Sequence, residues 1–143
     1  MTDSELTAPA TAGRRPGRLI RTGLLATLAA TAATTVTAAA ARSAGVDFEI
    51  PAGGEAIPLP GFAVVTAFFS AVGFALAGAL LRRSTRPATH FVRTTLLLTA
   101  LSLLPPLAAG ADTPTTTTLL GLHLVPAAVM IPTLTRSLRG ATG

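Results

Sequence analysis

Residues 62–81 read FAVVTAFFSAVGFALAGALL and carry no charged side chain. An α-helix of 20 residues is about 30 Å long, which matches the thickness of the hydrocarbon core of a bilayer. This stretch therefore predicts a transmembrane helix.

The whole chain has the composition of a membrane protein. Hydrophobic residues make up 50% of its 143 residues, charged residues make up 12%, and the mean hydropathy is +0.61. A soluble domain typically has about twice this share of charge, and disorder requires high charge with low hydrophobicity. The length suggests one domain.

Three further apolar runs complete the fold, and the four predicted spans cover about 19–41, 62–81, 92–111 and 114–138. The prediction is an all-α fold, with a four-helix transmembrane bundle over 19–139 and a disordered cytoplasmic tail over 1–18. For the fourth helix, Thr113 is the predicted N-cap and Pro114 the first helical residue.

The arginines predict the orientation. Ten of the eleven flank the spans on one side, and Arg42 alone lies on the other. Because arginine-rich loops stay in the cytoplasm, we expect a multi-pass protein of the plasma membrane with both termini cytoplasmic. The first span also resembles a signal peptide, with a basic start and Ala38-Ala39-Ala40 as a cleavage site. We favour a retained helix, because the run is longer than a signal core.

Small residues predict how the helices pack. Lipid supplies little hydrophobic force between helices, so the close approach of small side chains matters. The first two spans carry small residues at every fourth position: Ala29, Ala33, Thr37 and Ala41, then Ala67, Ala71, Ala75 and Ala79. We expect these stripes to pack the two helices together; a dimerisation face is the other interpretation.

Prolines and a histidine predict a polar layer in the outer half of the bundle. The prolines of the last two spans free backbone carbonyls that need partners in hydrocarbon. Four polar side chains form the candidate pocket: His123, Ser102, Thr66 and Thr35. In the functional interpretation this pocket holds a solute, a proton or water. In the simpler one, His123 bonds to a freed carbonyl or a threonine.

The loop between the first two spans predicts a short extracytoplasmic β-hairpin. Val46, Phe48 and Ile50 alternate with acidic residues, and residues 51–54 supply a turn. Charged residues on this side are candidate contacts for a cation or a basic partner: Arg42, Asp47, Glu49, Glu55 and Asp112. The simpler interpretation is a solvated loop in which one acid pairs with Arg42.

Several function classes lack their residues in this sequence. The chain has no cysteine, which excludes disulfides and thiolate sites, and it has no P-loop, Rossmann, HExxH or GxSxG pattern. The two histidines, His90 and His123, are predicted about 20 Å apart along the membrane normal, too far to ligate one haem. We expect no enzymatic activity, no cofactor and no metal. Because the arginines border apolar runs, we expect no nucleic acid partner.

The chain resembles a family of small actinobacterial membrane proteins classed as a domain of unknown function. The similar runs are residues 44–50 (AGVDFEI), 54–62 (GEAIPLPGF), 93–95 (RTT), 101–105 (LSLLP), 111–113 (ADT) and 122–126 (LHLVP). The resemblance covers about 19–139. It implies a four-helix integral membrane protein with no established activity.

From these patterns we expect a structural, interaction or accessory component of the cell envelope. Its expected partners are the lipid bilayer and either a second copy or another membrane protein. The alternative is a small-solute carrier or sensor with a polar pocket near His123.

Overall fold

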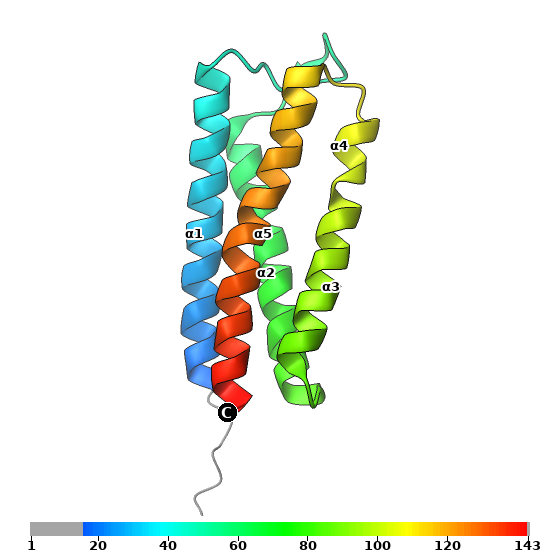
Figure 1. Cartoon of the computed structure of the whole chain (residues 1–143). Helices are drawn as coiled ribbons and strands as arrows, with labels where there is room; N and C mark the ends of the chain where they lie inside the picture. Colours follow the sequence, from blue (N-terminus) through cyan, green and yellow to red (C-terminus); the bar gives the residue numbers. More distant parts are fainter. Residues whose placement is uncertain (1–15, 143) are drawn as a thin grey trace, which may run out of the picture.

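The computed structural model describes residues 16–142 and shows an up-and-down bundle of helices (Figure 1). The helices are α1 (Pro16–Ser43), α2 (Leu59–Arg83), α3 (Pro87–Ser102), α4 (Leu104–Ala108) and α5 (Thr113–Thr142). Because α4 continues α3 across a break, the described chain makes four crossings, each long and apolar enough to span a membrane. The predicted four-helix bundle is confirmed.

A two-stranded hairpin between α1 and α2 is also confirmed. Strand β1 (Glu49–Ile50) pairs antiparallel with β2 (Glu55–Ala56), with Glu49 opposite Ala56 and Ile50 opposite Glu55. The turn residues 51–54 connect the two strands, as their composition predicts.

Most helices extend a few residues beyond the predicted spans, and two differences change the interpretation. Helix α1 begins at Pro16, so Arg18 belongs to the helix and not to the predicted tail; residues 1–15 of that tail lie outside the described residues. The third crossing is broken at Leu103, because Pro105 and Pro106 cannot donate the backbone hydrogen bonds that would continue α3.

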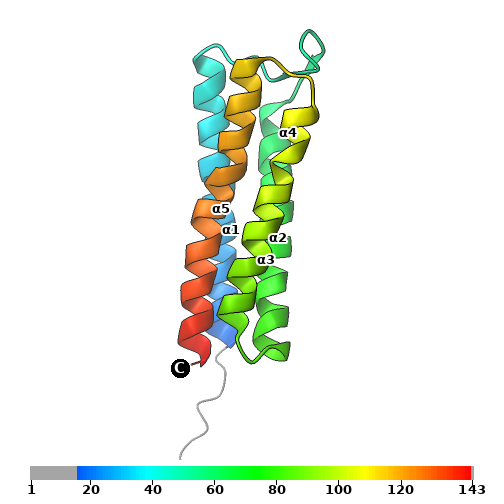
Figure 2. The ribbon, with the colours of Figure 1, turned by 45° about the vertical axis from the view of Figure 1, so that its right-hand side comes forward.

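The helices pack so that α1 and α3 each contact both α2 and α5 (Figure 2). Two apolar clusters fill the interior. One cluster joins α1, α2, α3 and α5 and includes Leu19, Ala30, Leu81, Phe91 and Leu134. The other lies under the hairpin and includes Ala38, Phe48, Phe62, Leu119 and Leu122.

The predicted stripes lie on the wrong faces of the first two helices. Helices α1 and α2 do pack together, but Ala71, Ala75 and Ala79 are exposed. The buried residues are instead Leu19, Gly23, Ala26, Ala30, Thr34 and Ala38 on α1, and Phe62, Thr66, Ser70, Ala77 and Leu81 on α2. On α1 the buried residues Ala26, Ala30, Thr34 and Ala38 are themselves four apart. The spacing of small residues therefore does not distinguish the buried face from a neighbouring one, and adjacent residues lie about 100° apart around the helix.

One close contact fixes how α1 meets α2. A Cβ added at Gly23 would lie 2.2 Å from a ring carbon of Phe74, so the ring occupies the space that any larger side chain would need. Phe74 packs against the cluster that contains Leu19 and Leu81. Gly23 therefore lets an aromatic ring lie directly on the backbone of α1.

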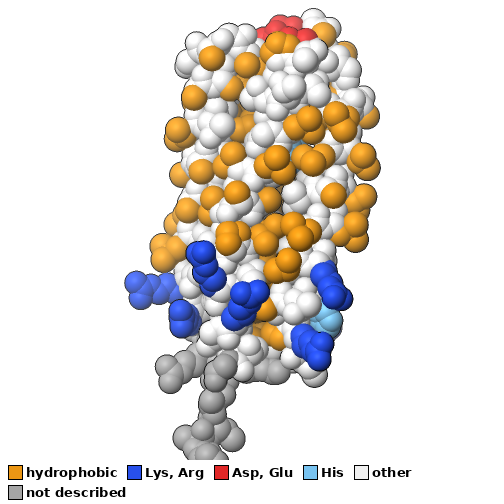
Figure 3. All heavy atoms as spheres, in the orientation of Figure 1, with side chains coloured by type: hydrophobic (Ala, Val, Ile, Leu, Met, Phe, Trp, Pro, Cys, Tyr) orange, Lys and Arg blue, Asp and Glu red, His pale blue; other side chains and the backbone are white. Residues whose placement is uncertain are grey.

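The charges separate to the two ends of the bundle (Figure 3). The acidic end carries the four described carboxylates, which belong to Asp47, Glu49, Glu55 and Asp112. The arginine end carries every described arginine except Arg42: Arg18, Arg21, Arg82, Arg83, Arg86, Arg93, Arg136 and Arg139. An apolar band lies between the two ends.

Candidate functional site

The acidic end is closed by the hairpin cap, which we define as residues 44–58. Phe48 is its centre: the side chain is fully buried and its ring centroid lies 4.9 Å from that of Phe62. Its backbone has φ 61°, a left-handed conformation that is uncommon outside glycine. The packing of Phe48 therefore holds the loop in a conformation that the backbone alone disfavours.

The side chain of Arg42 contacts residues of the hairpin cap and not a carboxylate. Its guanidinium lies 5.6 Å from the Phe48 ring centroid and donates a hydrogen bond to the carbonyl of Ile57. The predicted pairing of Arg42 with a loop acid is therefore absent among the described residues. The aromatic face and a loop carbonyl satisfy this lone arginine instead.

Two hydrogen bonds tie the cap to the far side of the bundle. The hydroxyl of Thr115 donates to Asp47 Oδ1 at 3.1 Å, and the amide of Ala52 donates to the carbonyl of Gly110 at 3.0 Å. The first bond joins the cap to α5, and the second joins it to the α4–α5 connection. The cap thus links the ends of α1, α2 and α5 and the connection that follows α4.

Three of the four predicted acidic contacts hold the fold together. Asp47 Oδ1 also accepts from the amide of Glu49, and Glu49 Oε2 accepts from the amide of Gly53 at 2.9 Å. Asp112 Oδ1 accepts from the amide of Thr115 at 2.8 Å. Glu55 lies exposed on β2.

Asp112 is the N-cap of α5, one residue before the predicted cap. Its carbonyl accepts the helical bond from the amide of Thr116 while its side chain bonds to Thr115. Thr113 and Pro114 then occupy the first two helical positions, where a missing proline amide costs nothing.

The candidate polar pocket is not joined by hydrogen bonds between its members. His123 Nδ1 lies 2.7 Å from the carbonyl of Leu119 in its own helix, so that nitrogen carries the proton. Ser102 bonds to the carbonyl of Thr99 and Thr35 to that of Thr31, again within one helix. Thr66 is buried on α2. Three of the four side chains thus form their hydrogen bonds with backbone carbonyls of their own helix.

Several hydroxyls outside the predicted set are also buried in this region. Thr34 is 2% exposed, and its hydroxyl has no hydrogen-bond partner; the buried hydroxyl of Thr31 has none either. Thr66 and Ser70 are buried on the facing helix α2. Thr35 is the predicted member of the pocket, and the structure shows that its neighbour Thr34 is the buried residue.

The described residues hold no group of three His, Cys, Asp or Glu side chains that could bind a metal. His90 lies exposed near the start of α3, where its Nδ1 is 2.7 Å from the Ser84 hydroxyl. His123 lies in the first half of α5, toward the acidic end of the bundle. Nothing in this arrangement brings the two histidines to one site.

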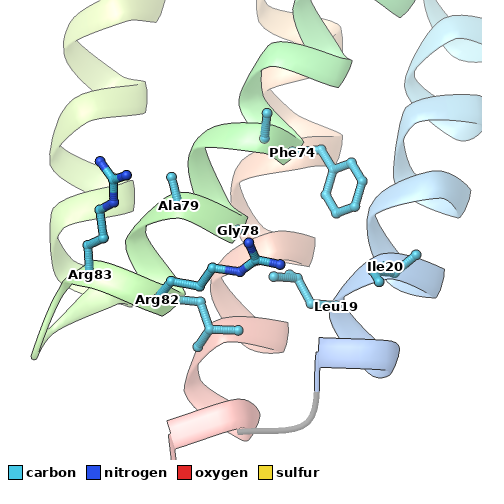
Figure 4. A pocket seen from close by; sticks show the side chains of 9 residues that line it. Leu19, Ile20, Phe74, Gly78, Ala79, Arg82 and Arg83 are labelled. Atoms are coloured by element: carbon cyan, nitrogen blue, oxygen red, sulfur yellow. The ribbon is translucent and has the colours of Figure 1, made fainter.

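Two grooves are open between neighbouring helices. One, of about 290 Å³, lies between α1 and α5 and is lined by residues such as Ala26, Ala29 and Val129. The other, of about 590 Å³, lies between α1 and α2 at the arginine end (Figure 4). Neither is lined by a residue of the candidate polar pocket.

Comparison with known proteins gives a family but no activity. Neither the curated proteins nor the solved structures gave a match. A family of unknown function, DUF6069, matches residues 14–140, which include the hairpin cap and all of the bundle except the last two residues of α5. The chain therefore belongs to the DUF6069 family of unknown function.

Proposed function

We propose that this protein is a multi-pass component of the plasma membrane that acts by contacting another membrane protein or a second copy, without catalytic activity. One observation carries the proposal: apolar side chains fill the described interior of the bundle, while a face of small residues on α2 is exposed on its outer surface. Apolar clusters occupy both halves of the bundle, and the buried ring of Phe48 closes the acidic end. Ala71, Ala75 and Ala79 remain exposed on α2.

The exposed alanines suit a protein contact within the bilayer. Helices associate in lipid mainly by close backbone approach, which small side chains permit. Next to Ala71 on the same helix, Phe68 is 62% exposed and offers an aromatic surface beside the small residues. We assign this face of α2 to the partner.

The charge distribution supports an orientation with both termini in the cytoplasm. The arginine end holds both the start of α1 and the end of α5, and the acidic end holds the cap (Figures 1 and 3). Arginine-rich loops favour the cytoplasmic side. Helix α1 contributes to both apolar clusters, which supports a retained helix over a cleaved signal peptide.

The test is assembly in the native membrane. Ala71→Leu enlarges an exposed side chain and should abolish the cross-linked species that the wild type forms in intact cells. Val65→Leu is the matched control, because Val65 is 55% exposed on α2 outside the small-residue face. The size of the cross-linked species distinguishes a second copy from a different protein. A wild type that stays monomeric, or an unchanged pattern for Ala71→Leu, would overturn the proposal.

The alternative function is a carrier or sensor of a small polar solute, and the unpartnered hydroxyls of Thr31 and Thr34 favour it. Pro126 also leaves the carbonyl of Leu122 without its helical donor. A Thr34→Cys variant of this cysteine-free chain separates the two functions. A small water-soluble thiol reagent should modify Cys at position 34 if a solute path exists, and should not if the layer is dry. A cysteine at exposed Gly53 is the positive control.

A further inference from the structure

The groove between α1 and α2 has an apolar wall and an arginine rim. Leu19 and Ile20 line it from α1, and Phe74, Gly78, Ala79 and Arg82 line it from α2 (Figure 4). Its volume of about 590 Å³ lies in the range of small-molecule sites. The groove is therefore large enough for part of a lipid.

The floor of the groove is open because of a glycine. A Cβ built at Gly78 meets no atom within 4 Å, which means that a larger residue would fit there without displacing the protein. Phe74 forms the deep end, where its ring is seated against Gly23. Phe74 and Arg82 are eight residues apart on α2, which corresponds to about 12 Å along the helix axis.

The rim is positively charged and lacks a counter-charge among residues 16–142. Arg82 and Arg83 both line the groove, whereas the four described carboxylates lie at the opposite end of the bundle (Figure 3). In Figure 4 the guanidinium of Arg82 extends from α2 toward Leu19, across the mouth of the groove. An anion at the mouth would therefore meet a guanidinium.

We propose that this groove binds one anionic phospholipid, whose phosphate pairs with Arg82 and whose acyl chain lies along Gly78 toward Phe74. Basic pockets between transmembrane helices recognise anionic headgroups, and arginine suits phosphate through paired hydrogen bonds. The inference rests on the membrane placement in the proposed function, but not on the orientation or on the protein partner.

A lipid fits this groove better than a second copy of the chain does. Two copies that met through this groove would bring Arg82 and Arg83 of each copy into the contact itself. Like charges across an interface oppose association, whereas an anionic lipid neutralises them. The groove overlaps the small-residue face at Ala75 and Ala79, whereas Ala71 lies nearer the middle of α2 and does not line it.

The test is lipid retention by the full chain in detergent micelles, titrated with phosphatidylglycerol or phosphatidylcholine and read by native mass spectrometry. Gly78→Leu fills the floor and should remove the bound phosphatidylglycerol. Gly121→Leu is its control, because Gly121 is an exposed helical glycine whose Cβ also meets nothing within 4 Å. Arg82→Gln should weaken binding of phosphatidylglycerol about fivefold. Arg93→Gln should not, because Arg93 is exposed at the same end and does not line the groove.

Each outcome bears on the proposal. Preferential retention of phosphatidylglycerol that both groove variants reduce and both controls keep would support it. Equal retention of the two lipids, or unchanged phosphatidylglycerol binding in Gly78→Leu, would overturn it. Binding of inorganic phosphate alone to the same extent as phosphatidylglycerol would also overturn it. Cross-linking of two copies through a cysteine at Gly78 would show that a second copy covers the groove. The Ala71→Leu assembly test remains independent of all these results.

Discussion

Phe48 is the residue whose removal tests the hairpin cap most directly. Its side chain is fully buried although it belongs to a loop outside the helices, and it contacts Phe62 with a centroid distance of 4.9 Å. Replacing a buried Phe by Ala costs about 3–5 kcal/mol, and the aromatic pair alone accounts for about 0.5–1.5 kcal/mol. We expect Phe48→Ala to lower the free energy of unfolding by about 4 kcal/mol.

The left-handed backbone of Phe48 gives a second expectation, which reverses the usual order of stability of alanine and glycine variants. At φ 61° an alanine keeps the strain that glycine avoids. Phe48→Gly should therefore be more stable than Phe48→Ala by about 1 kcal/mol, although glycine usually destabilises a folded chain relative to alanine.

The assay uses the absence of cysteine in the chain. A reporter cysteine at Ala30, which is fully buried in the cluster at the arginine end, reacts with a thiol reagent when the bundle unfolds in increasing sodium dodecyl sulfate. Phe68→Ala is the matched control, because Phe68 is 62% exposed on the outside of α2. A Phe48→Ala effect within about 1 kcal/mol of the Phe68→Ala effect would refute the role of the ring. A glycine variant no more stable than the alanine variant would refute the backbone argument.

Three further predictions follow from other contacts. An impermeant thiol reagent should label a cysteine at Gly53 in intact cells but not one at Ser84 or Thr142, because the arginine end should face the cytoplasm; labelling at Ser84 would reverse the orientation. Asp112→Ala should cost about 1 kcal/mol of stability in the same unfolding assay, since it removes the N-cap of α5, and Asp112→Asn should retain most of it. Gly23→Ala should cost about 1–3 kcal/mol, because its Cβ overlaps the Phe74 ring. Gly17→Ala, whose Cβ meets nothing, should be neutral, and equal effects at the two glycines would contradict the contact.

The number of helices and the hairpin were predictable because hydropathy and turn residues are local signals. The apolar run at 62–81 became most of α2, and the turn at 51–54 joins β1 to β2. Pro105 and Pro106 also predicted a disturbance of the third crossing, which is the break at Leu103.

The buried faces were not predictable, because a membrane helix is apolar on every side. On α1 and α2 alanine, threonine and glycine occur on several faces, so a stripe of small residues does not indicate which face is buried. The contact between Gly23 and Phe74 determines which face of α1 packs against α2. It joins residues 51 positions apart in the chain. The burial of Phe48 depends likewise on Phe62 and Arg42, which only the folded loop brings to it.

The break at Leu103 has a consequence for the bilayer that this protein fits. Helix α3 alone, with 16 residues, is about 24 Å long and too short for a hydrocarbon core of about 30 Å. The five residues of α4 supply the missing length, whereas the other three crossings have 25 to 30 residues and length to spare. Hydrophobic mismatch in a thicker membrane therefore falls first on the α3–α4 crossing. In the membrane placement that we propose, this jointed segment sets the upper limit of hydrocarbon thickness for the bundle.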